Sequence, residues 1–388
     1  MKKTIRDFDL KGKRVLIRVD FNVPLDKNLN VTDDNRIRAS LPTIQYALER
    51  GASKVILMSH LGRPDGKPDP SMSLKPAAER LSRLLGRPVV QLPDHAGPIN
   101  SKAAVAVLEN LRFTPAEEAN DPAFARQLAE NADIYINDAF GSSHRAHASI
   151  DAITKCLPSG AGLLLEKEIR YLGETVQNPK KPFVAVLGGS KVSDKIGVVE
   201  NLLSKVDKII IGGAMAYTFL KVQGVNIGAS RFEKDKTDLA RAILEKARSK
   251  KVEMVLPVDH VCVQKLEPGV SMRIEGPAIP DGWLGVDIGP KSIEKFSKAL
   301  EGAKTVIWNG PMGVFETPPF DTGSRAVAEK LTRLKDAVTV IGGGDTAACV
   351  IGFGLDGRMT HISTGGGASL EYLEGKTLPG IAALQDRL

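Results

Sequence analysis

The chain has 388 residues, 42% of them hydrophobic, which is enough for two or three globular domains with sizeable cores. Its formal net charge of +7 is spread along the sequence without a dense Lys/Arg run. This pattern argues against a nucleic-acid-binding protein and suits an enzyme whose ligands are anions. The three cysteines form no C-x-x-C pair, the amino terminus lacks the apolar core of a signal peptide, and no apolar stretch is long enough to span a bilayer, so we expect a cytoplasmic enzyme with no membrane partner.

Short apolar runs alternate with amphipathic segments along the whole chain, and this alternation predicts strands separated by helices. Such βαβ units form parallel sheets, and nine strands are many for one sheet. We therefore expect an α/β fold of two Rossmann-like domains, each with a parallel sheet. The predicted strands are residues 15–19, 55–58, 105–108, 134–136, 183–187, 208–211, 254–256, 305–308 and 338–341. The predicted helices are residues 37–50, 74–85, 237–248 and 325–334.

A charged helical segment followed by prolines predicts the boundary between the two domains. Residues 166–176 have a helical, highly charged pattern, and the Asn-Pro-Lys-Lys-Pro sequence of residues 178–182 ends it, because proline cannot continue a helix. The expected parts are a first domain of residues 1–165, an interdomain helix and linker of residues 166–180, a second domain of residues 181–370 and a carboxy-terminal segment of residues 371–388.

Basic side chains follow the predicted strands of the first half, at the edge where open α/β sheets bind ligands. Guanidinium groups pair bidentately with carboxylate or phosphate, so several of them in one place would bind a compact polyanion. Taken alone, any one of these arginines is better interpreted as a solvated surface residue, and a histidine is equally well interpreted as loop packing, but the set favours an anion site. The set is Arg36, His60, Arg63, Arg112 and Arg145, with Asp20 and Asn22 in the same loops and His144 and His147 beside Arg145.

In the second half, the predicted strands lead into glycines, as in Gly188-Gly189, Gly212-Gly213, Gly310-Pro311 and Gly342–Thr346. Backbone N–H groups of such turns and the helix N-termini behind them bind polyphosphate. Lys191 and Lys195 are spaced to share a helix face, where two cations repel unless an anion lies beside them. Asp345 is either a helix N-cap or a ligand of Mg²⁺, which prefers one or two carboxylates plus substrate phosphates.

A polyanion site in one half and a polyphosphate site in the other match phosphoryl transfer, which needs mainly positioning and charge neutralisation from the protein. Two other classes stay open. A nicotinamide dehydrogenase also has two α/β domains, but the G-x-G-x-x-G of residues 352–357 follows a predicted helix instead of a strand. A non-catalytic polyanion-binding or nucleic-acid-binding protein would interleave basic with aromatic residues, and aromatics are only 5%.

Seven longer motifs give the chain a resemblance that runs nearly from end to end. They are RVDFNVP (18–24), SHLGRP (59–64), NDAFGSSHRAH (137–147), LGGSKVSDKI (187–196), WNGPMGVFE (308–316), GGGDT (342–346) and STGGGAS (363–369). With these motifs the chain resembles the phosphoglycerate kinase family. The resemblance implies reversible transfer of a phosphoryl group from 1,3-bisphosphoglycerate to ADP, giving 3-phosphoglycerate and ATP in glycolysis. It also implies a Mg²⁺ cofactor and two domains that close about a hinge, and we expect a monomer.

The resemblance also implies roles for individual residues. The phosphoglycerate site would comprise Asp20, Phe21, Asn22, Arg36, His60, Leu61, Gly62, Arg63, Arg112 and Arg145. The nucleotide site would comprise Gly188, Gly189, Lys191, Lys195, Gly212, Gly213, Pro311, Glu316, Gly343, Gly344, Asp345 and Thr346. Glu316 is expected at the ribose and Asp345 at the metal. Arg36, Lys191 and the helix N-terminus at Gly344 are expected to neutralise the transferring group, and the carboxy-terminal segment is expected to pack on the first domain.

Overall fold

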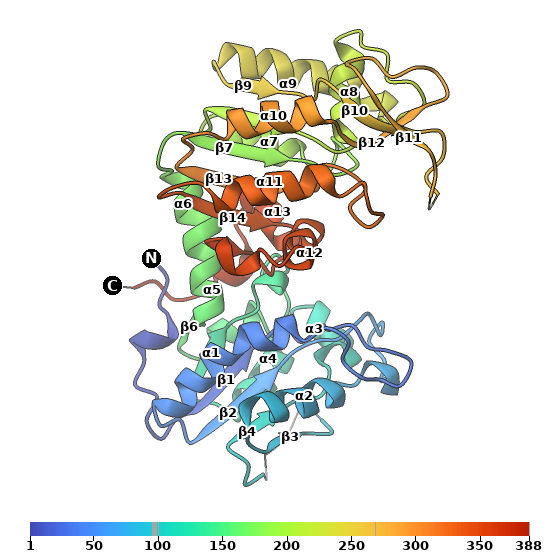
Figure 1. Ribbon diagram of the computed structural model, residues 1–388. Coiled ribbons are helices and arrows are strands. Elements are labelled where there is room, and N and C mark those ends of the chain that lie inside the picture. Colours follow the sequence, from blue (N-terminus) through green and yellow to red (C-terminus); the bar gives the residue numbers. More distant parts are fainter. Residues whose placement is uncertain (95–98, 100, 268, 388) are drawn as a thin grey trace. The chain divides into compact units, whose positions relative to one another are not determined.

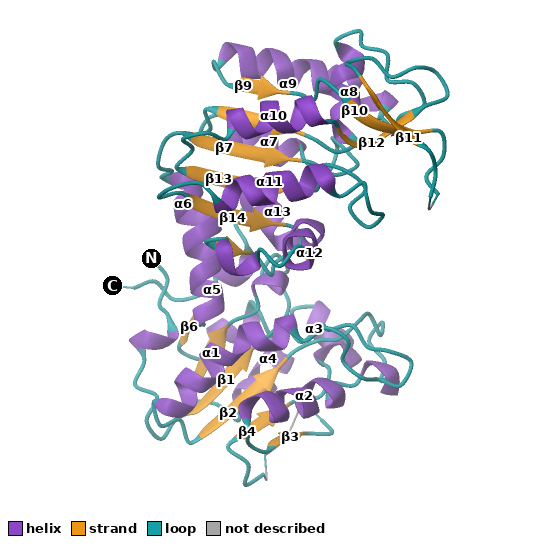
Figure 2. Cartoon of the chain, viewed as in Figure 1, coloured by secondary structure: helices purple, strands orange, loops and turns teal. Residues whose placement is uncertain are grey.

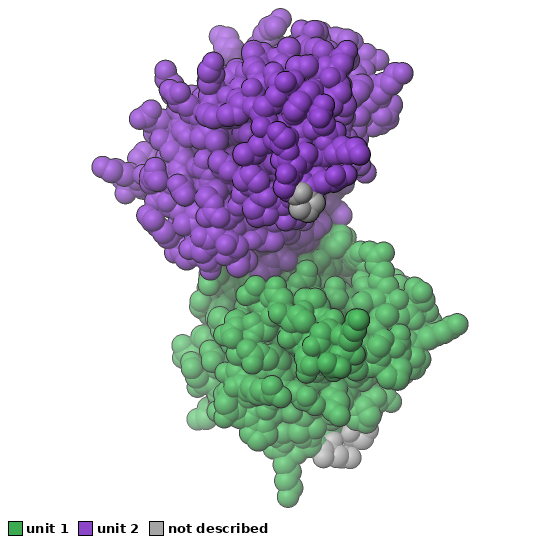
Figure 3. All heavy atoms as spheres, turned by 45° about the vertical axis from the view of Figure 1, so that its right-hand side comes forward, with its two compact units in different colours: residues 1–169, 377–388 green, residues 170–376 purple. Residues whose placement is uncertain are grey.

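The computed structural model describes residues 1–94, 99, 101–267 and 269–387. The chain divides into two compact units, which have different colours in Figure 3. Unit 1 comprises Met1–Ile169 and Thr377–Leu388, and unit 2 comprises Arg170–Lys376. Leu388 itself lies outside the described residues. Each unit has its own six-stranded sheet and its own hydrophobic core.

The centre of unit 1 is a parallel sheet with the strand order β3-β4-β2-β1-β5-β6 (Figure 1). Its central strands are continuous apolar runs, because a parallel sheet is covered by helices on both faces. The strands are β1 (Arg14–Arg18), β2 (Lys54–Met58), β3 (Val89–Gln91), β4 (Val105–Val107), β5 (Ile134–Asn137) and β6 (Ser159–Ala161). The helices are α1 (Asn35–Glu49), α2 (Lys75–Leu85), α3 (Pro115–Glu118), α4 (Pro122–Ala129), α5 (Leu163–Glu168) and α14 (Pro379–Ala382).

Unit 2 contains the second parallel sheet, with the order β15-β14-β13-β7-β8-β9, and helices lie alongside it (Figure 2). Trp308 and Phe296 are fully buried in its core. The strands are β7 (Phe183–Leu187), β8 (Lys208–Ile211), β9 (Glu253–Val255), β13 (Thr305–Asn309), β14 (Val338–Gly342) and β15 (His361–Ile362). The helices are α6 (Thr175–Gln177), α7 (Ile196–Leu202), α8 (Met215–Val222), α9 (Thr237–Ser249), α10 (Pro290–Ala299), α11 (Thr322–Thr332), α12 (Gly344–Gly352) and α13 (Gly367–Leu373).

The nine strands expected from the sequence are all present, each with boundaries within one residue of the expected range. The α/β class with two parallel sheets is therefore confirmed. Unit 2 also has a small antiparallel sheet that the sequence did not predict, formed by β10 (His260–Val263), β11 (Met272–Glu275) and β12 (Leu284–Ile288). Strand β11 is mostly exposed, so its sequence lacks the buried face that would have marked it as a strand.

The charged segment expected to be one helix is interrupted in its middle. Helix α5 ends at Glu168, a π-helical segment spans Ile169–Glu174, and α6 follows to Gln177. Asn178 then ends the helix, ahead of the prolines. Within the described residues, no helix combines the length and the hydropathy needed to cross a membrane.

The carboxy-terminal residues of unit 1 lie beside its amino terminus. The Lys3 amide donates to the Gln385 carbonyl at 2.8 Å, and Lys2 forms an ion pair with Asp386 at 3.2 Å. Further along, the Gly380 amide donates to the Ser143 carbonyl at 2.8 Å. The last residues of the chain thereby become part of unit 1, next to the loop that follows β5.

Candidate functional site

The polar residues expected to bind an anion come from segments that follow the strands of unit 1. We call this set the arginine surface. The structure brings four of its basic residues into electrostatic range: the charges of Arg112 and Arg36 act on His60, and the charge of Arg145 acts on Arg112. The arginine surface comprises Asp20, Asn22, Arg36, His60, Arg63, Arg112 and Arg145. The side chains of Phe21 and Leu61 are instead buried in the core, so they support these loops from below.

Arg36 is held by a carboxylate at the start of α1. Its Nη1 donates to Asp20 Oδ2 at 2.8 Å, and the other oxygen of Asp20 accepts from the Asn22 amide at 3.1 Å. The side chain of Arg36 is still 38% exposed, whereas that of Asp20 is 11% exposed. A guanidinium has five N–H donors, so Asp20 orients Arg36 and leaves donors free for an anion.

The loop after β2 is joined to two neighbouring segments through Gly62. The Gly62 amide donates to Asn22 Oδ1 at 2.9 Å, and its carbonyl accepts from Arg112 Nη1 at 2.8 Å. Gly62 has a φ of +64°, and a Cβ there would lie 2.7 Å from the sulfur of Met72, so glycine is favoured at this position. The next residue, Arg63, is exposed and makes no hydrogen bond or ion pair with any described residue. Its guanidinium is therefore available to a ligand.

His60 is buried, and its protonation is determined by the arginine beneath it. Arg18 Nη2 lies 3.1 Å from His60 Nδ1, and because arginine can only donate, Nδ1 must be the acceptor. Burial lowers the pKa of His60 well below its ordinary value, and the charges of Arg18, Arg112 and Arg36 lower it further. The ring is therefore neutral near pH 7 and carries its proton on Nε2. His60 acts as a hydrogen-bond donor and not as a cation.

A buried polar network below the arginine surface balances the charge of Arg18. Arg18 is 1% exposed, and its Nε donates to Ser149 Oγ at 2.9 Å. Ser149 Oγ donates in turn to Glu117 Oε1 at 2.6 Å, and Glu117 is completely buried. Sequence reasoning missed all three residues. A signal existed only for Arg18, as a charged residue directly after the apolar run of residues 15–17.

His144 and His147, left open between ligand and loop packing, both contact protein groups. His144 Nε2 accepts from Arg145 Nε at 3.3 Å. His147 is buried, with Nδ1 3.8 Å from Glu117 Oε1. Burial lowers the pKa of His147 to about 4, and the charge of Arg112 lowers it in the same direction. His147 is therefore neutral near pH 7 and packs against the buried network.

Glycine turns after β7, β8 and β13 interlock in unit 2, and we call them the glycine surface (Gly188, Gly189, Gly212, Gly213, Gly310 and Pro311). A Cβ on Gly213 would lie 2.5 Å from main-chain atoms of Gly189, and one on Gly188 would lie 2.2 Å from the Pro311 carbonyl oxygen. Gly310 has a φ of +100° and is equally close to Gly188. Only glycine permits three loops to approach this closely.

The expectation that the amides of these glycines bind phosphate is wrong for four of them. The amides of Gly188 and Gly189 donate to the carbonyls of Asn309 and Pro311, both at 3.0 Å. Those of Gly212 and Gly213 donate to the carbonyls of Leu187 and Met312, at 2.8 and 3.0 Å. Because each N–H already has a protein partner, these glycines provide a flat, side-chain-free wall instead of anion-binding amides.

The N-terminus of α12 does offer free amides. Gly343 precedes the helix with a φ of +88°, and the first bond of the helix runs from the Ala347 amide to the Gly343 carbonyl. The amides of Gly344, Asp345 and Thr346 come before that bond, at the positive end of the helix dipole. The buried Thr346 hydroxyl accepts from the Gly310 amide at 2.6 Å, which fixes this helix to the glycine surface.

Asp345 is not a helix cap. The cap position is Gly343, and the exposed carboxylate of Asp345 makes no hydrogen bond or ion pair with any described residue. No group of three His, Cys, Asp or Glu side chains suited to a metal was found among the described residues. A lone carboxylate fits Mg²⁺ that is bound mostly by water and substrate phosphates, and it does not fit a permanent metal centre.

The expectation that Lys191 and Lys195 share a helix face is wrong. Residues 191–195 form turns, and α7 begins only at Ile196. Lys195 is mostly buried and donates from Nζ to Asn309 Oδ1. Burial lowers its pKa, while the nearby charges of Asp194 and Asp345 act in the opposite direction. Lys191 is exposed and has no partner among the described residues, so the two cations have different environments.

Glu316 lies in an exposed turn that a buried carboxylate holds from behind. Asp287 accepts from the Gly323 amide at 2.7 Å and from the Ile288 amide at 2.8 Å. A Cβ on Gly313 would lie 2.4 Å from Asp287 Oδ1, so this turn packs directly on the carboxylate. Burial raises the pKa of Asp287 to about 7. Nothing in the sequence marked this residue as part of the site.

The dehydrogenase alternative lacks its structural context. Residues 352–357 begin at the last residue of α12 and precede β15, so their G-x-G-x-x-G is not a turn between a strand and a helix. The pyrophosphate-binding arrangement of a Rossmann fingerprint cannot form there. The glycine-rich features of unit 2 that follow strands are instead the glycine surface and the N-terminus of α12.

Comparisons with known proteins identify the family of the chain. The family model described as phosphoglycerate kinase matches residues 5–376. The phosphoglycerate kinase of Thermosipho africanus is 55% identical, over 100% of this chain and 98% of that protein. The Arabidopsis thaliana protein named phosphoglycerate kinase 3, cytosolic, is 54% identical, over 99% and 98%. The solved structure of phosphoglycerate kinase from Coxiella burnetii has a TM-score of 0.91 at 40% identity and covers 99% of this chain and 98% of that one. The expected phosphotransferase activity is thereby confirmed, and the chain belongs to the phosphoglycerate kinase family.

Proposed function

We propose that the chain transfers a phosphoryl group reversibly from 1,3-bisphosphoglycerate to ADP, giving 3-phosphoglycerate and ATP, as a step of glycolysis. Membership of the family supports the reaction. The observation that carries the assignment to this chain is the arginine surface, where Arg36 and Arg112 lie within electrostatic range of a neutral His60 and Arg145 lies within electrostatic range of Arg112. A small molecule with both a carboxylate and a phosphate matches such a set.

Unit 1 would bind the phosphoglycerate. Arg63, Arg112 and Arg145 would form charge-assisted hydrogen bonds to its phosphate and carboxylate, each worth about 1.5–3 kcal/mol. His60 would donate one more from Nε2, without adding a charge. Arg36, oriented by Asp20, would contact the transferring phosphoryl group, where charge is shared among three oxygens in the transition state.

Unit 2 would bind the nucleotide. The glycine surface would receive the flat base and sugar, with Glu316 at the ribose, and the free amides of α12 together with Lys195 would neutralise the phosphates. Lys191 and the amide at Gly344 would act on the transferring group. Asp345 would hold Mg²⁺ through its exposed carboxylate. The ion would supply charge neutralisation of the nucleotide phosphates when bound.

Three accompanying assignments stay predictions. Transfer requires both substrates in line, so we propose that the unit holding each substrate closes on the other during turnover. Small-angle scattering without compaction in the presence of both substrates would count against closure. We also propose a monomer, which sedimentation tests, and a cytoplasmic location, which the name of the Arabidopsis relative supports.

One assay tests the reaction. ADP formation from ATP is measured with Mg²⁺, with and without 3-phosphoglycerate. We expect ADP only when 3-phosphoglycerate is present, and loss of the signal when Mg²⁺ is chelated. ADP release at the same rate without 3-phosphoglycerate would identify a simple nucleotide hydrolase and overturn the proposal.

A further inference from the structure

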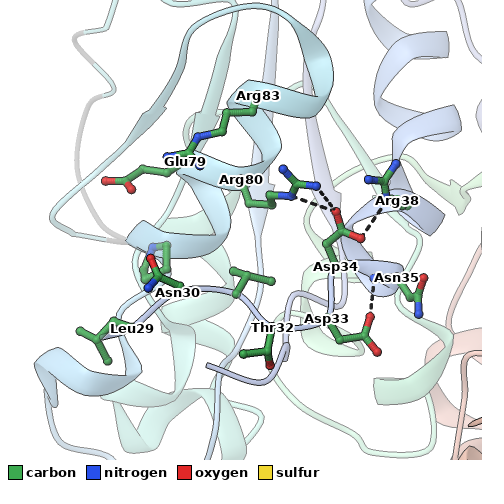
Figure 4. Close-up of a pocket in the computed structure, with 12 residues that line it drawn as sticks. Leu29, Asn30, Thr32, Asp33, Asp34, Asn35, Arg38, Glu79, Arg80 and Arg83 are labelled. Atoms are coloured by element: carbon green, nitrogen blue, oxygen red, sulfur yellow. Dashed lines mark hydrogen bonds and ion pairs between the residues drawn. The ribbon is translucent and has the colours of Figure 1, made fainter. Parts of the chain in front are cut away.

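A carboxylate in unit 1 bridges two helices at the wall of a polar pocket (Figure 4). Asp34 Oδ1 accepts from Arg38 Nε at 2.8 Å, and Arg38 belongs to α1. Asp34 Oδ2 accepts from Arg80 Nε at 2.9 Å and from Arg80 Nη2 at 2.6 Å, and Arg80 belongs to α2. We call these three residues the Asp34 bridge. Both oxygens of this carboxylate thereby accept from arginines.

The position of Asp34 gives the bridge its significance. Asp34 is the residue immediately before α1, where a carboxylate would ordinarily cap the helix, but its side chain makes no cap bond. Asp33 takes that role instead, since its Oδ1 accepts from the Asn35 amide at 2.8 Å. Asp34 is therefore free to tie the first turn of α1 to α2, and its side chain is 17% exposed in that arrangement.

The turn that the bridge holds is the one that carries Arg36. Arg36 is the second residue of α1 and lies between Asp34 and Arg38 in the sequence. The first turn of a helix frays most readily, because its leading amides lack partners within the helix. The contact between Arg36 and Asp20 fixes the tip of that side chain, whereas the Asp34 bridge fixes the backbone from which it extends.

The pocket itself is not an anion site. Its lining contains three arginines, and Asp33, Asp34 and Glu79 match them in number. Two of those arginines are already paired with Asp34. A second anion would have to displace a carboxylate that accepts three hydrogen bonds. The remaining interpretation is that the Asp34 bridge holds the first turn of α1 against α2.

We propose that Asp34 and Arg80 are positioning residues for Arg36, which hold the first turn of α1 against α2 so that the Arg36 guanidinium meets the transferring phosphoryl group. The inference rests on the role proposed above for Arg36. Neither residue belongs to the arginine surface, and the carboxylate of Asp34 is occupied by Arg38 and Arg80, so the effect of losing the bridge is expected in kcat. Small displacements of a catalytic group reduce rates by up to about 100-fold per ångström.

The test compares Arg80→Ala with Arg83→Ala. Arg83 lies one turn further along α2 and lines the same pocket, and it makes no hydrogen bond or ion pair within the described part of the chain. We expect Arg80→Ala to lower kcat about three- to tenfold with the nucleotide KM unchanged, which is a small fraction of the limit for a misplaced group. We expect Arg83→Ala to match the unmodified protein. Arg80→Lys should recover part of the loss, because a lysine can still reach one oxygen of Asp34.

A double variant separates positioning from simple stability. In the Arg36→Ala background, Arg80→Ala should have no further effect on kcat, since there is no guanidinium left to position. An equal loss in both backgrounds, or equal losses for Arg80→Ala and Arg83→Ala, would overturn the inference. If Arg36→Ala alone keeps a near-normal kcat, the proposed role of Arg36 fails and the inference falls with it. If Arg36→Ala lowers kcat strongly and Arg80→Ala does not lower it at all, this inference is overturned while the proposed role of Arg36 stands.

Discussion

Replacing Arg18 with methionine tests the buried network under the arginine surface. Arg18 donates to Ser149 Oγ at 2.9 Å and to His60 Nδ1 at 3.1 Å. The Ser149 hydroxyl donates in turn to the fully buried Glu117. Methionine fills similar space but removes the cation that is linked to Glu117 through Ser149, while the charge of Arg112 still acts on Glu117. Removing one side of a direct buried ion pair costs about 3–5 kcal/mol. Because a serine hydroxyl separates Arg18 from Glu117, we expect a smaller fall, about 1–3 kcal/mol, in the free energy of unfolding.

The assay has to report on unit 1. Both tryptophans, Trp283 and Trp308, belong to unit 2, so tryptophan fluorescence would follow the other unit. Urea unfolding followed by circular dichroism is the suitable measurement. A matched control is Arg14→Met, since Arg14 on the same strand forms an ion pair with Asp133 but its side chain is 44% exposed. Exposed pairs contribute about 0–1 kcal/mol, so this control should lose little.

A double variant tests the coupling between Arg18 and Glu117 directly. Adding Glu117→Gln removes the stranded charge, so the double variant should be at least about 1 kcal/mol more stable than the sum of the two single losses predicts. Simple additivity, or a loss below about 1 kcal/mol for Arg18→Met alone, would show that the two charges are not coupled.

Three further predictions concern unit 2. Lys195→Ala should raise the nucleotide KM most and leave the KM for 3-phosphoglycerate unchanged; an unchanged nucleotide KM in steady-state assays would count against its assignment. Gly213→Ala should destabilise the protein by more than the roughly 1–2 kcal/mol of a left-handed residue, because its Cβ would lie 2.5 Å from main-chain atoms of the neighbouring turn. Gly224→Ala, with a φ of +81° and nothing within 4 Å, is the control for that thermal-unfolding comparison, and equal losses would contradict the interlocked loops. Asp287, with a pKa raised to about 7, contributes stability that is present below pH 4 and lost as pH rises through 7. His260, with a pKa lowered to about 4, contributes stability that is present above pH 6.5 and lost as pH falls through 4. Asp287→Asn and His260→Gln should therefore tilt the pH profile of unfolding, measured between pH 4 and 7, in opposite directions; parallel profiles would refute this.

The sheets could be predicted because their strands are buried on both faces. Residues 183–187 and 208–211 are continuous apolar runs, and β7 and β8 have those exact bounds. Strand β11 could not be predicted, since Met272 and Ile274 are 52% and 59% exposed and no periodic burial marks the segment. Its pairing with β10 is a tertiary contact that local sequence does not encode.

The candidate site also has features that could be predicted from the sequence and features that could not. The arginines of unit 1 were recognisable because their side chains follow strand ends. The amides of Gly188 and Gly213 were misinterpreted, because whether an N–H is free depends on a carbonyl more than a hundred residues away or in a neighbouring loop. The link from Arg18 through Ser149 to Glu117 joins three segments that have no common sequence pattern.

The most direct test of the central claim is a steady-state comparison of Arg36→Ala with the unmodified protein, at saturating ATP, Mg²⁺ and 3-phosphoglycerate. Arginines that stabilise a transferring phosphoryl group contribute about 10³–10⁵ in rate. We predict that kcat falls by at least about a thousandfold while the KM for 3-phosphoglycerate changes far less. A near-normal kcat with a large rise in that KM would mean that Arg36 only binds the substrate, and it would contradict the proposed mechanism.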